Sequence, residues 1–117
     1  MWWRRPFPAA LSISLARWPR QQRQRRRRAW RFQGAGTQAY ENIRAALAAA
    51  GGGFEHIVKL TQYLIHLRAH QALIREVRAK FFNPELPPPA STMIQVGALT
   101  REGALYEVDA VAVLPPR

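Results

Sequence analysis

The chain contains no cysteine. This absence excludes disulfide bonds, thiol chemistry and cysteine-based metal sites, and it fits a reducing compartment, so we expect a cytoplasmic protein. No apolar run approaches the roughly 20 residues that a transmembrane helix needs, and we expect no membrane partner. With 117 residues and a mass of 13.4 kDa, the chain has room for one domain, whose small core an oligomer would help to complete.

Acidic residues are absent from residues 1–36, which hold ten arginines. Residues 37–117 hold eight lysines and arginines against seven acids, so nearly all of the net charge of +11 belongs to the N-terminal end. Residues 20–28 are six arginines and three glutamines, a composition that no core accommodates. We therefore expect a basic, poorly ordered segment over residues 1–36, with a short strand near residues 10–15, and a folded domain over residues 37–117.

Two other interpretations of the basic segment stay open. Its arginines could contact phosphates while Trp18 and Trp30 stack on bases, which would make the protein RNA-associated. A solvated tail is the simpler explanation, and we do not expect a nucleic-acid partner. The second interpretation concerns the gene, because stretches rich in Arg, Pro and Trp without acids are typical of GC-rich coding sequence read out of frame. Read one nucleotide later, the codons for residues 30–36 can encode Gly-Asp-Phe-Arg-Ala-Gln, so a frameshift within residues 16–36 is a hypothesis.

Apolar periodicity predicts five elements after this segment. They are a helix over residues 37–50, a strand over 57–67, a helix over 69–82 and strands over 92–99 and 104–113. Thr37 can cap the first helix and Gly51 can end it. A hairpin-length turn over residues 100–103 joins the last two strands.

This order of elements predicts an α+β fold with both helices on one face of a sheet. The opposite face of the sheet is then bare. Because an exposed apolar sheet face is unstable alone, we expect it to form a subunit interface.

The last predicted strand carries two acids. Successive strand residues point to opposite faces, so Glu107 and Asp109 share one face while Val108 and Ala110 share the other. Carboxylates in an otherwise Val/Ala strand either face water or line a site.

Three histidines raise the question of a metal site. His66 and His70 have i,i+4 spacing, but they straddle a predicted strand-to-helix turn, and His56 stands at no supportive spacing. We therefore interpret them as loop histidines and expect no bound metal.

Several segments together resemble one family of proteins. They are residues 38–43 (QAYENI), 46–51, 57–59, 81–82, 89–92 (PAST) and 107–112 (EVDAVA). In this order and spacing, residues 37–114 resemble the reactive-intermediate deaminase A family, also called YjgF-like or endoribonuclease L-PSP-like. The resemblance extends more faintly to residues 11–14.

The resemblance implies a chorismate-mutase-like α+β fold, in which two helices on one face back a mixed sheet. It also implies a homotrimer whose sheets pack inward, with small-molecule sites in the clefts between subunits. Active members hydrolyse reactive enamines and imines to ketoacids and ammonia, without a metal or organic cofactor.

The resemblance also assigns candidate site residues. Glu107 matches the catalytic glutamate, which acts on water as a general acid or base. Asp109 matches an acid two positions on, and Arg75 falls near a position that lines the cleft. Ser91 stands where active members carry the arginine that clamps the substrate carboxylate, so the activity is either altered or lost. We therefore expect Glu107 to be catalytic and Ser91, Arg75 and Asp109 to bind substrate, with a non-catalytic metabolite-binding trimer as the alternative.

Overall fold

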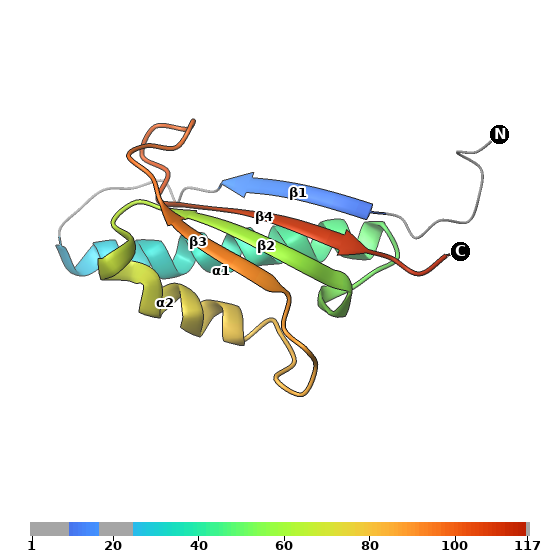
Figure 1. Ribbon diagram of the computed structural model, residues 1–117. Coiled ribbons are helices and arrows are strands. Elements are labelled where there is room, and N and C mark those ends of the chain that lie inside the picture. The colour runs from blue at the N-terminus through green and yellow to red at the C-terminus, as the bar shows by residue number, and fades with distance from the viewer. Residues whose placement is uncertain (1–9, 17–24, 117) are drawn as a thin grey trace.

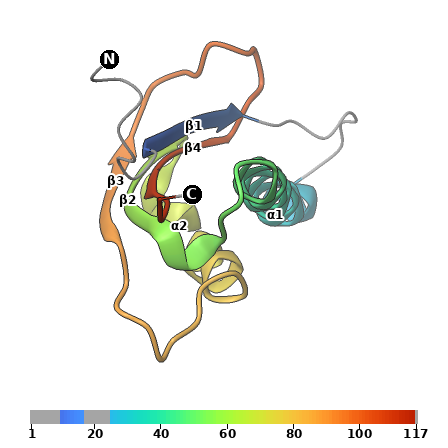
Figure 2. The same ribbon diagram turned by 90° about the vertical axis from the view of Figure 1, so that its right-hand side faces the viewer.

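The computed structural model describes residues 10–16 and 25–116. Within these ranges, four strands form one sheet, and two α-helices and a short 3-10 helix accompany it. In chain order the elements are β1 (Ala10–Ala16), α1 (Arg25–Ala49), η2 (Phe54–His56), β2 (Ile57–Leu64), α2 (Leu67–Ala79), β3 (Ala90–Gln95) and β4 (Tyr106–Val113). Both α-helices lie on one face of the sheet (Figures 1 and 2), as the order of the predicted elements indicates. The short strand expected near residues 10–15 is β1.

The strands lie in the order β1-β4-β2-β3. β4 is antiparallel to both of its neighbours, whereas β2 and β3 are parallel, so the sheet is mixed. The predicted hairpin between the last two strands is wrong, because β2 lies between β3 and β4. Parallel strands need a crossover connection, and α2 supplies it between β2 and β3. The segment over residues 96–105 then passes β2 to reach β4.

Helix α1 begins at Arg25, well before the start predicted at Thr37. Gly36 is buried within it, and a Cβ atom there would lie 2.9 Å from Ile74 Cδ1, so the missing side chain lets α1 approach α2 closely. Phe32, one turn earlier, is fully buried, and its ring stacks on that of His70 with the ring centroids 4.1 Å apart. Glycine weakens a helix locally, so packing against α2 is what stabilises this glycine-containing part of α1.

The C-terminal end of α1 follows the sequence. Gly51 has a φ of 83°, the left-handed conformation that glycine adopts without steric cost. The Gly52 amide donates to the Leu47 carbonyl at 2.8 Å, which satisfies a carbonyl of the last turn. The helix therefore ends at the predicted glycine run.

The core lies between the two helices and the sheet. Both helices contribute stripes of fully buried side chains, and β2 and β4 contribute alternate residues. The largest apolar or aromatic ones are Phe32, Tyr40, Ile43 and Leu47 from α1, Ile74 and Val77 from α2, Leu60 and Leu64 from β2, and Tyr106 and Val108 from β4. Among the described residues, both helices lie on this side and none covers the other face of the sheet (Figure 2).

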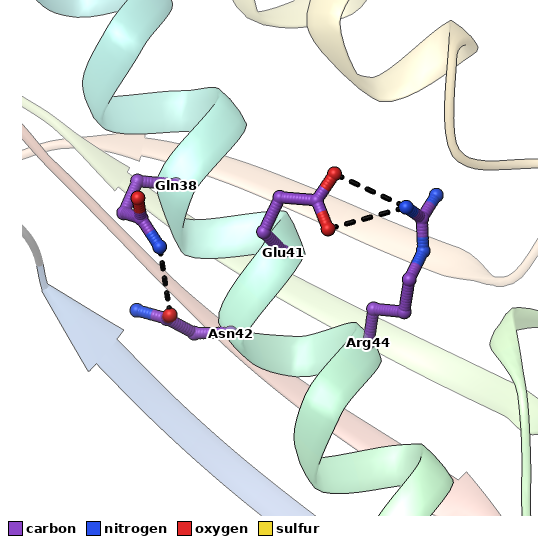
Figure 3. Close-up of polar contacts among 4 residues, drawn as sticks. All are labelled: Gln38, Glu41, Asn42 and Arg44. Atoms are coloured by element: carbon purple, nitrogen blue, oxygen red, sulfur yellow. Dashed lines mark hydrogen bonds and ion pairs between the residues drawn. The ribbon is translucent and has the colours of Figure 1, made fainter.

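The outer surface of α1 carries short-range polar pairs (Figure 3). Gln38 Nε2 donates to Asn42 Oδ1 at 2.9 Å, and Arg44 Nη1 lies 3.1 Å from both carboxylate oxygens of Glu41. The Glu41–Arg44 ion pair is exposed and adds little to stability, whereas the Gln38–Asn42 hydrogen bond is partly buried. Although α1 spans 25 residues, no helix within the described ranges is both long and apolar enough to cross a bilayer.

Candidate functional site

Strand β4 places the two predicted acids on the sheet face that points away from the helices. Glu107 and Asp109 are half-buried there, whereas Val108 and Ala110 are buried under the helices. The alternation of β4 therefore confirms that the two acids share a face.

Tyr63 of β2 joins these acids on the same face. Its register partner across the ladder is Glu107, and its hydroxyl is near enough to Asp109 for that carboxylate to affect its pKa. Loss of solvation raises the pKa of Tyr63, and the negative charges of Asp109 and Glu107 raise it further. Tyr63 could not be selected from the sequence, because its place beside the acids depends on how β2 pairs with β4.

Asp109 is incompletely satisfied within one chain. Its Oδ1 atom is buried and has no hydrogen-bond partner among the described residues. A buried polar atom without a partner is costly, so an unsatisfied carboxylate oxygen calls for a partner from outside these residues.

Ser91 of β3 lies on the opposite, helix-facing side of the sheet. Its Oγ atom accepts hydrogen bonds from Gln62 Nε2 at 3.1 Å and from Arg78 Nη1 at 3.0 Å. Gln62 is fully buried, whereas Ser91 is exposed at the edge strand. Ser91 therefore connects the buried side of the sheet to the surface of α2.

A cluster of buried polar groups continues from Gln62 into the core. The Oε1 atom of Gln62 lies 2.9 Å from the Tyr106 hydroxyl and 3.3 Å from the Tyr40 hydroxyl. The two hydroxyl oxygens are 3.1 Å apart. Burial raises the pKa of both tyrosines, and the positive charge of Arg78 opposes this rise at each. Tyr40, Gln62, Tyr106, Ser91 and Arg78 thus form one continuous polar path, which we call the Gln62 path.

Arg75 and Arg78 of α2 both line a cavity of about 660 Å³. The cavity lies between the C-terminal half of α2, the η2 segment and the proline-rich segment over residues 84–89. Arg75 is exposed at its surface, and Arg78 is half-buried.

The predicted site residues therefore form two groups in one chain. Glu107 and Asp109 occupy one face of the sheet, while Ser91 and Arg75 lie on the helix side. The structure does not bring the four together within one chain. The sequence analysis missed Gln62 and Arg78, although an arginine one turn after Arg75 was a visible signal.

The histidines have local structural contacts. His56 Nδ1 accepts from the Gly53 amide at 3.0 Å, and His70 Nδ1 lies 3.0 Å from the His66 carbonyl oxygen while its ring stacks on Phe32. Within residues 10–16 and 25–116, no group of three or more His, Asp or Glu side chains could hold a metal ion.

Known proteins share both the sequence and the architecture. The family model described as Endoribonuclease L-PSP matches residues 19–114. The chain is 42% identical to protein DfrA of Myxococcus xanthus over 73 residues, which cover 62% of this chain and 53% of DfrA. It is 35% identical to a RutC family protein of Synechocystis over 78 residues, which cover 67% of this chain and 58% of that protein.

Solved structures give the same picture. A putative endoribonuclease from Klebsiella pneumoniae superimposes with a TM-score of 0.68 at 34% identity, covering 73% of this chain and 62% of that one. TdcF of E. coli, with bound serine, superimposes with a TM-score of 0.62 at 30% identity, covering 69% and 63%.

The mixed sheet with two helices on one face and these structural relatives define the chorismate-mutase-like class of α+β proteins. Within that class, the chain belongs to the endoribonuclease L-PSP family, also called YjgF-like. It spans somewhat more than half the length of DfrA and of the Synechocystis RutC family protein, at 53% and 58%.

Proposed function

We propose that this chain hydrolyses small reactive enamines or imines to ketoacids and ammonia, at clefts between the copies of a homotrimer. The observation that carries this proposal is the group of Tyr63, Glu107 and Asp109 on the helix-free sheet face of a YjgF-like protein. Carboxylates in such a position can handle the protons of an attacking water.

The reaction needs a base for water and an acid for the departing nitrogen. Glu107 takes a proton from the water as its oxygen bonds to the carbon of the C=N group. That proton then passes to the nitrogen, which gives a carbinolamine. Glu107 next carries the hydroxyl proton to the amine, which leaves as ammonia as the C=O bond forms. Asp109 and Tyr63 extend the polar surface beside Glu107.

The separation of the two residue groups favours a site built from two copies. Glu107 lies on the sheet face opposite to Ser91 and Arg75, so one chain cannot direct all three at one small substrate. The helix-free face also bears exposed apolar side chains, including Ile94 at 42% and Val113 at 39% exposure. Apolar surface of this kind favours contact with further copies of the chain.

Ammonia release from freshly generated imines tests the proposal. The Glu107→Gln variant should lose at least about a hundredfold in rate, because it keeps the shape but cannot accept a proton. Glu102→Gln, at an exposed position before β4, is the matched control and should keep the wild-type rate. A Glu107→Gln rate equal to that of the wild type would refute the proposed role.

Solution mass tests the assembly separately. The wild type should have about three times the chain mass of 13.4 kDa in dilute buffer. A stable monomer would contradict a site between copies.

A non-catalytic trimer that binds a small metabolite is the second candidate. The presence of Ser91 favours it, because a hydroxyl can hydrogen-bond a carboxylate but cannot neutralise its charge. Ammonia release at the uncatalysed rate by both the wild type and Glu107→Gln, together with saturable ligand binding, would select this function.

A further inference from the structure

Strand β1 lies at the border of the sheet, and we call the side of β1 that points away from β4 its outer edge. Within residues 10–16 and 25–116, β1 pairs with β4 alone and no strand lies along the outer edge (Figures 1 and 2). A border strand presents backbone N–H and C=O groups that can pair with a further strand. The outer edge is therefore a surface to which another strand can add.

The sequence of β1 lacks the features that usually protect such an edge. Its seven residues, ALSISLA, include no charged residue, no proline and no glycine. Natural proteins commonly block a border strand with lysine, proline or a bulge. The register with β4 runs from Ala10 to Ala16 without a shift, so β1 has no bulge either. The strand itself does not oppose pairing along its whole length.

The opposite border of the sheet, strand β3, differs in both respects. β3 directly follows the prolines over residues 87–89, which have no N–H group to donate to a further strand. Its sequence, ASTMIQ, has no internal symmetry. The two borders are therefore not equivalent as surfaces for an identical strand.

The sequence of β1 reads the same in both directions. Its residues match in pairs about the central Ile13: Ala10 with Ala16, Leu11 with Leu15, and Ser12 with Ser14. Two antiparallel copies of β1 centred on Ile13 therefore place identical residues directly opposite each other. Such cross-strand pairs are the unit of stabilisation in a sheet, and a contact that uses the same patch on both copies has two-fold symmetry.

The hydrogen-bonding pattern of an antiparallel ladder permits this register. Alternate residues of a strand direct their backbone groups to the same neighbour, so one half of β1 bonds to β4 and the other half is directed to the outer edge. Pairing about Ile13 matches each residue with itself or with one an even number of positions away. Both members of every pair therefore belong to the same half, and the outward groups of one copy meet those of the other.

The register with β4 also assigns the two faces of the pairing. The apolar positions at the centre of β1 stand opposite Ala112, Ala110 and Val108, which are buried under the helices. The two serine positions belong to the helix-free face. Because directly opposite residues share a face, pairing about Ile13 keeps apolar positions beside apolar positions and serines beside serines.

We infer that the outer edge of β1 binds β1 of a second copy of this chain, antiparallel and centred on Ile13, so that the two sheets join into one. The self-complementary sequence of the strand selects a second copy over an unrelated strand. The contact uses the border of the sheet and not its helix-free face, so it goes beyond the proposed function and does not rest on it.

Single cysteines test the pairing in the full-length chain, which contains none of its own. Ile13→Cys places two thiols opposite each other, where the Cα atoms of an antiparallel pair lie about 4.5–5.5 Å apart, within reach of a disulfide. Under mild oxidation, linked pairs of chains should form at least about tenfold faster than with Arg68→Cys, a control at an exposed position of α2. Denaturing gels without reductant measure both rates, and equal rates would overturn the inference.

A mixture of two further variants tests the register. Ser12 of one copy should lie opposite Ser14 of the other, so Ser12→Cys and Ser14→Cys should link rapidly when they are mixed. Each variant alone should link slowly, because the diagonal positions are about 7–8 Å apart and out of disulfide reach. Rapid linking of each variant alone would indicate parallel strands and would refute the antiparallel register.

Two double variants keep the inference testable if a cysteine disturbs folding. Ser12→Lys with Ser14→Lys places like charges opposite each other between the copies, whereas Ser12→Glu with Ser14→Lys places opposite charges there. Both carry the same change opposite Asp109 of their own chain, so the comparison isolates residue 12.

In a sedimentation series over protein concentration, the oppositely charged variant should self-associate about tenfold more tightly than the like-charged one. Circular dichroism checks that both are folded. Equal self-association of the two folded variants would refute pairing through β1, even if both form the proposed trimer through the helix-free face.

Discussion

The two faces of the sheet treat their polar side chains differently. On the helix side, Gln62 is fully buried and its carbonyl oxygen lies within hydrogen-bond distance of two tyrosine hydroxyls. On the other face, Asp109 has a buried carboxylate oxygen with no partner among the described residues. A satisfied group of polar atoms stabilises one arrangement of the core, whereas an unsatisfied oxygen indicates that something further belongs beside it.

A polar residue in a strand can be part of the core structure or part of a functional site. Gln62 and Glu107 occupy adjacent central strands, yet only the register and the helix layer decide which one is structural. We expect the following measurements to distinguish the two faces, and the largest effect comes from the core.

A charge introduced on either side of β4 should have unequal consequences. Val108→Asp places a carboxylate under the helices without a partner, and it should lower the free energy of unfolding by on the order of 4 kcal/mol or more. The matched Val111→Asp lies on the helix-free face and should leave the chain folded while it lowers the solution mass of the proposed trimer. Circular dichroism and light scattering measure the two effects. If both substitutions lowered the free energy of unfolding equally, the two faces of the sheet would be equally buried within one chain, which contradicts this comparison.

High pH should weaken the helix-facing side. Burial raises the pKa of Tyr106 and Tyr40 above the ordinary value of 10.0, so the unfolded chain loses these protons first as the pH rises. Their contribution to stability is complete below pH 10 and is lost as the pH rises above it, by about 1.4 kcal/mol per pH unit for Tyr106 and in the same direction for Tyr40.

Urea unfolding between pH 8 and about 11 checks this slope. Tyr106→Phe should reduce the dependence of the free energy of unfolding on pH by the contribution of one tyrosine. Tyr63→Phe, on the other face, is the matched control and should change the slope less, because its hydroxyl is less buried. An unchanged slope in Tyr106→Phe would contradict the assignment to the core.

The third prediction concerns an exposed ion pair on the outside of the helix layer, where a substitution should have the smallest effect on stability. Glu41→Gln removes the pair with Arg44, whose side chains are 44% and 52% exposed, and should lower the free energy of unfolding by less than about 0.5 kcal/mol. The difference should vanish at high salt. If Glu41→Gln lowered the free energy of unfolding as much as Val108→Asp does, the ion pair would contribute far more to stability than an exposed pair should.

The parts of the site that depend on one strand could be predicted from the sequence. Alternation alone places Glu107 and Asp109 on one face, and the glycine run alone ends α1 at Gly51. Neither conclusion needs to know what the element packs against.

The parts that depend on pairing between distant segments could not be predicted. Tyr63 meets Asp109, and Gln62 meets Ser91, only because β2 is inserted between β3 and β4 in one register. The early start of α1 was missed for a similar reason, since Gly36 weakens the helix locally and fits it to α2. Contacts across the fold decided each of these cases.

The position of β4 has a consequence for synthesis. It is the last of the four strands along the chain, yet it lies between β1 and β2, and Ala10 pairs with Val113 across nearly the whole polypeptide. During translation β1 must wait beside the ribosome without its sheet neighbour until that strand has emerged. Such long-range pairing slows folding, so the nascent chain exposes unpaired strand edges to chaperones or to other nascent copies for most of its synthesis.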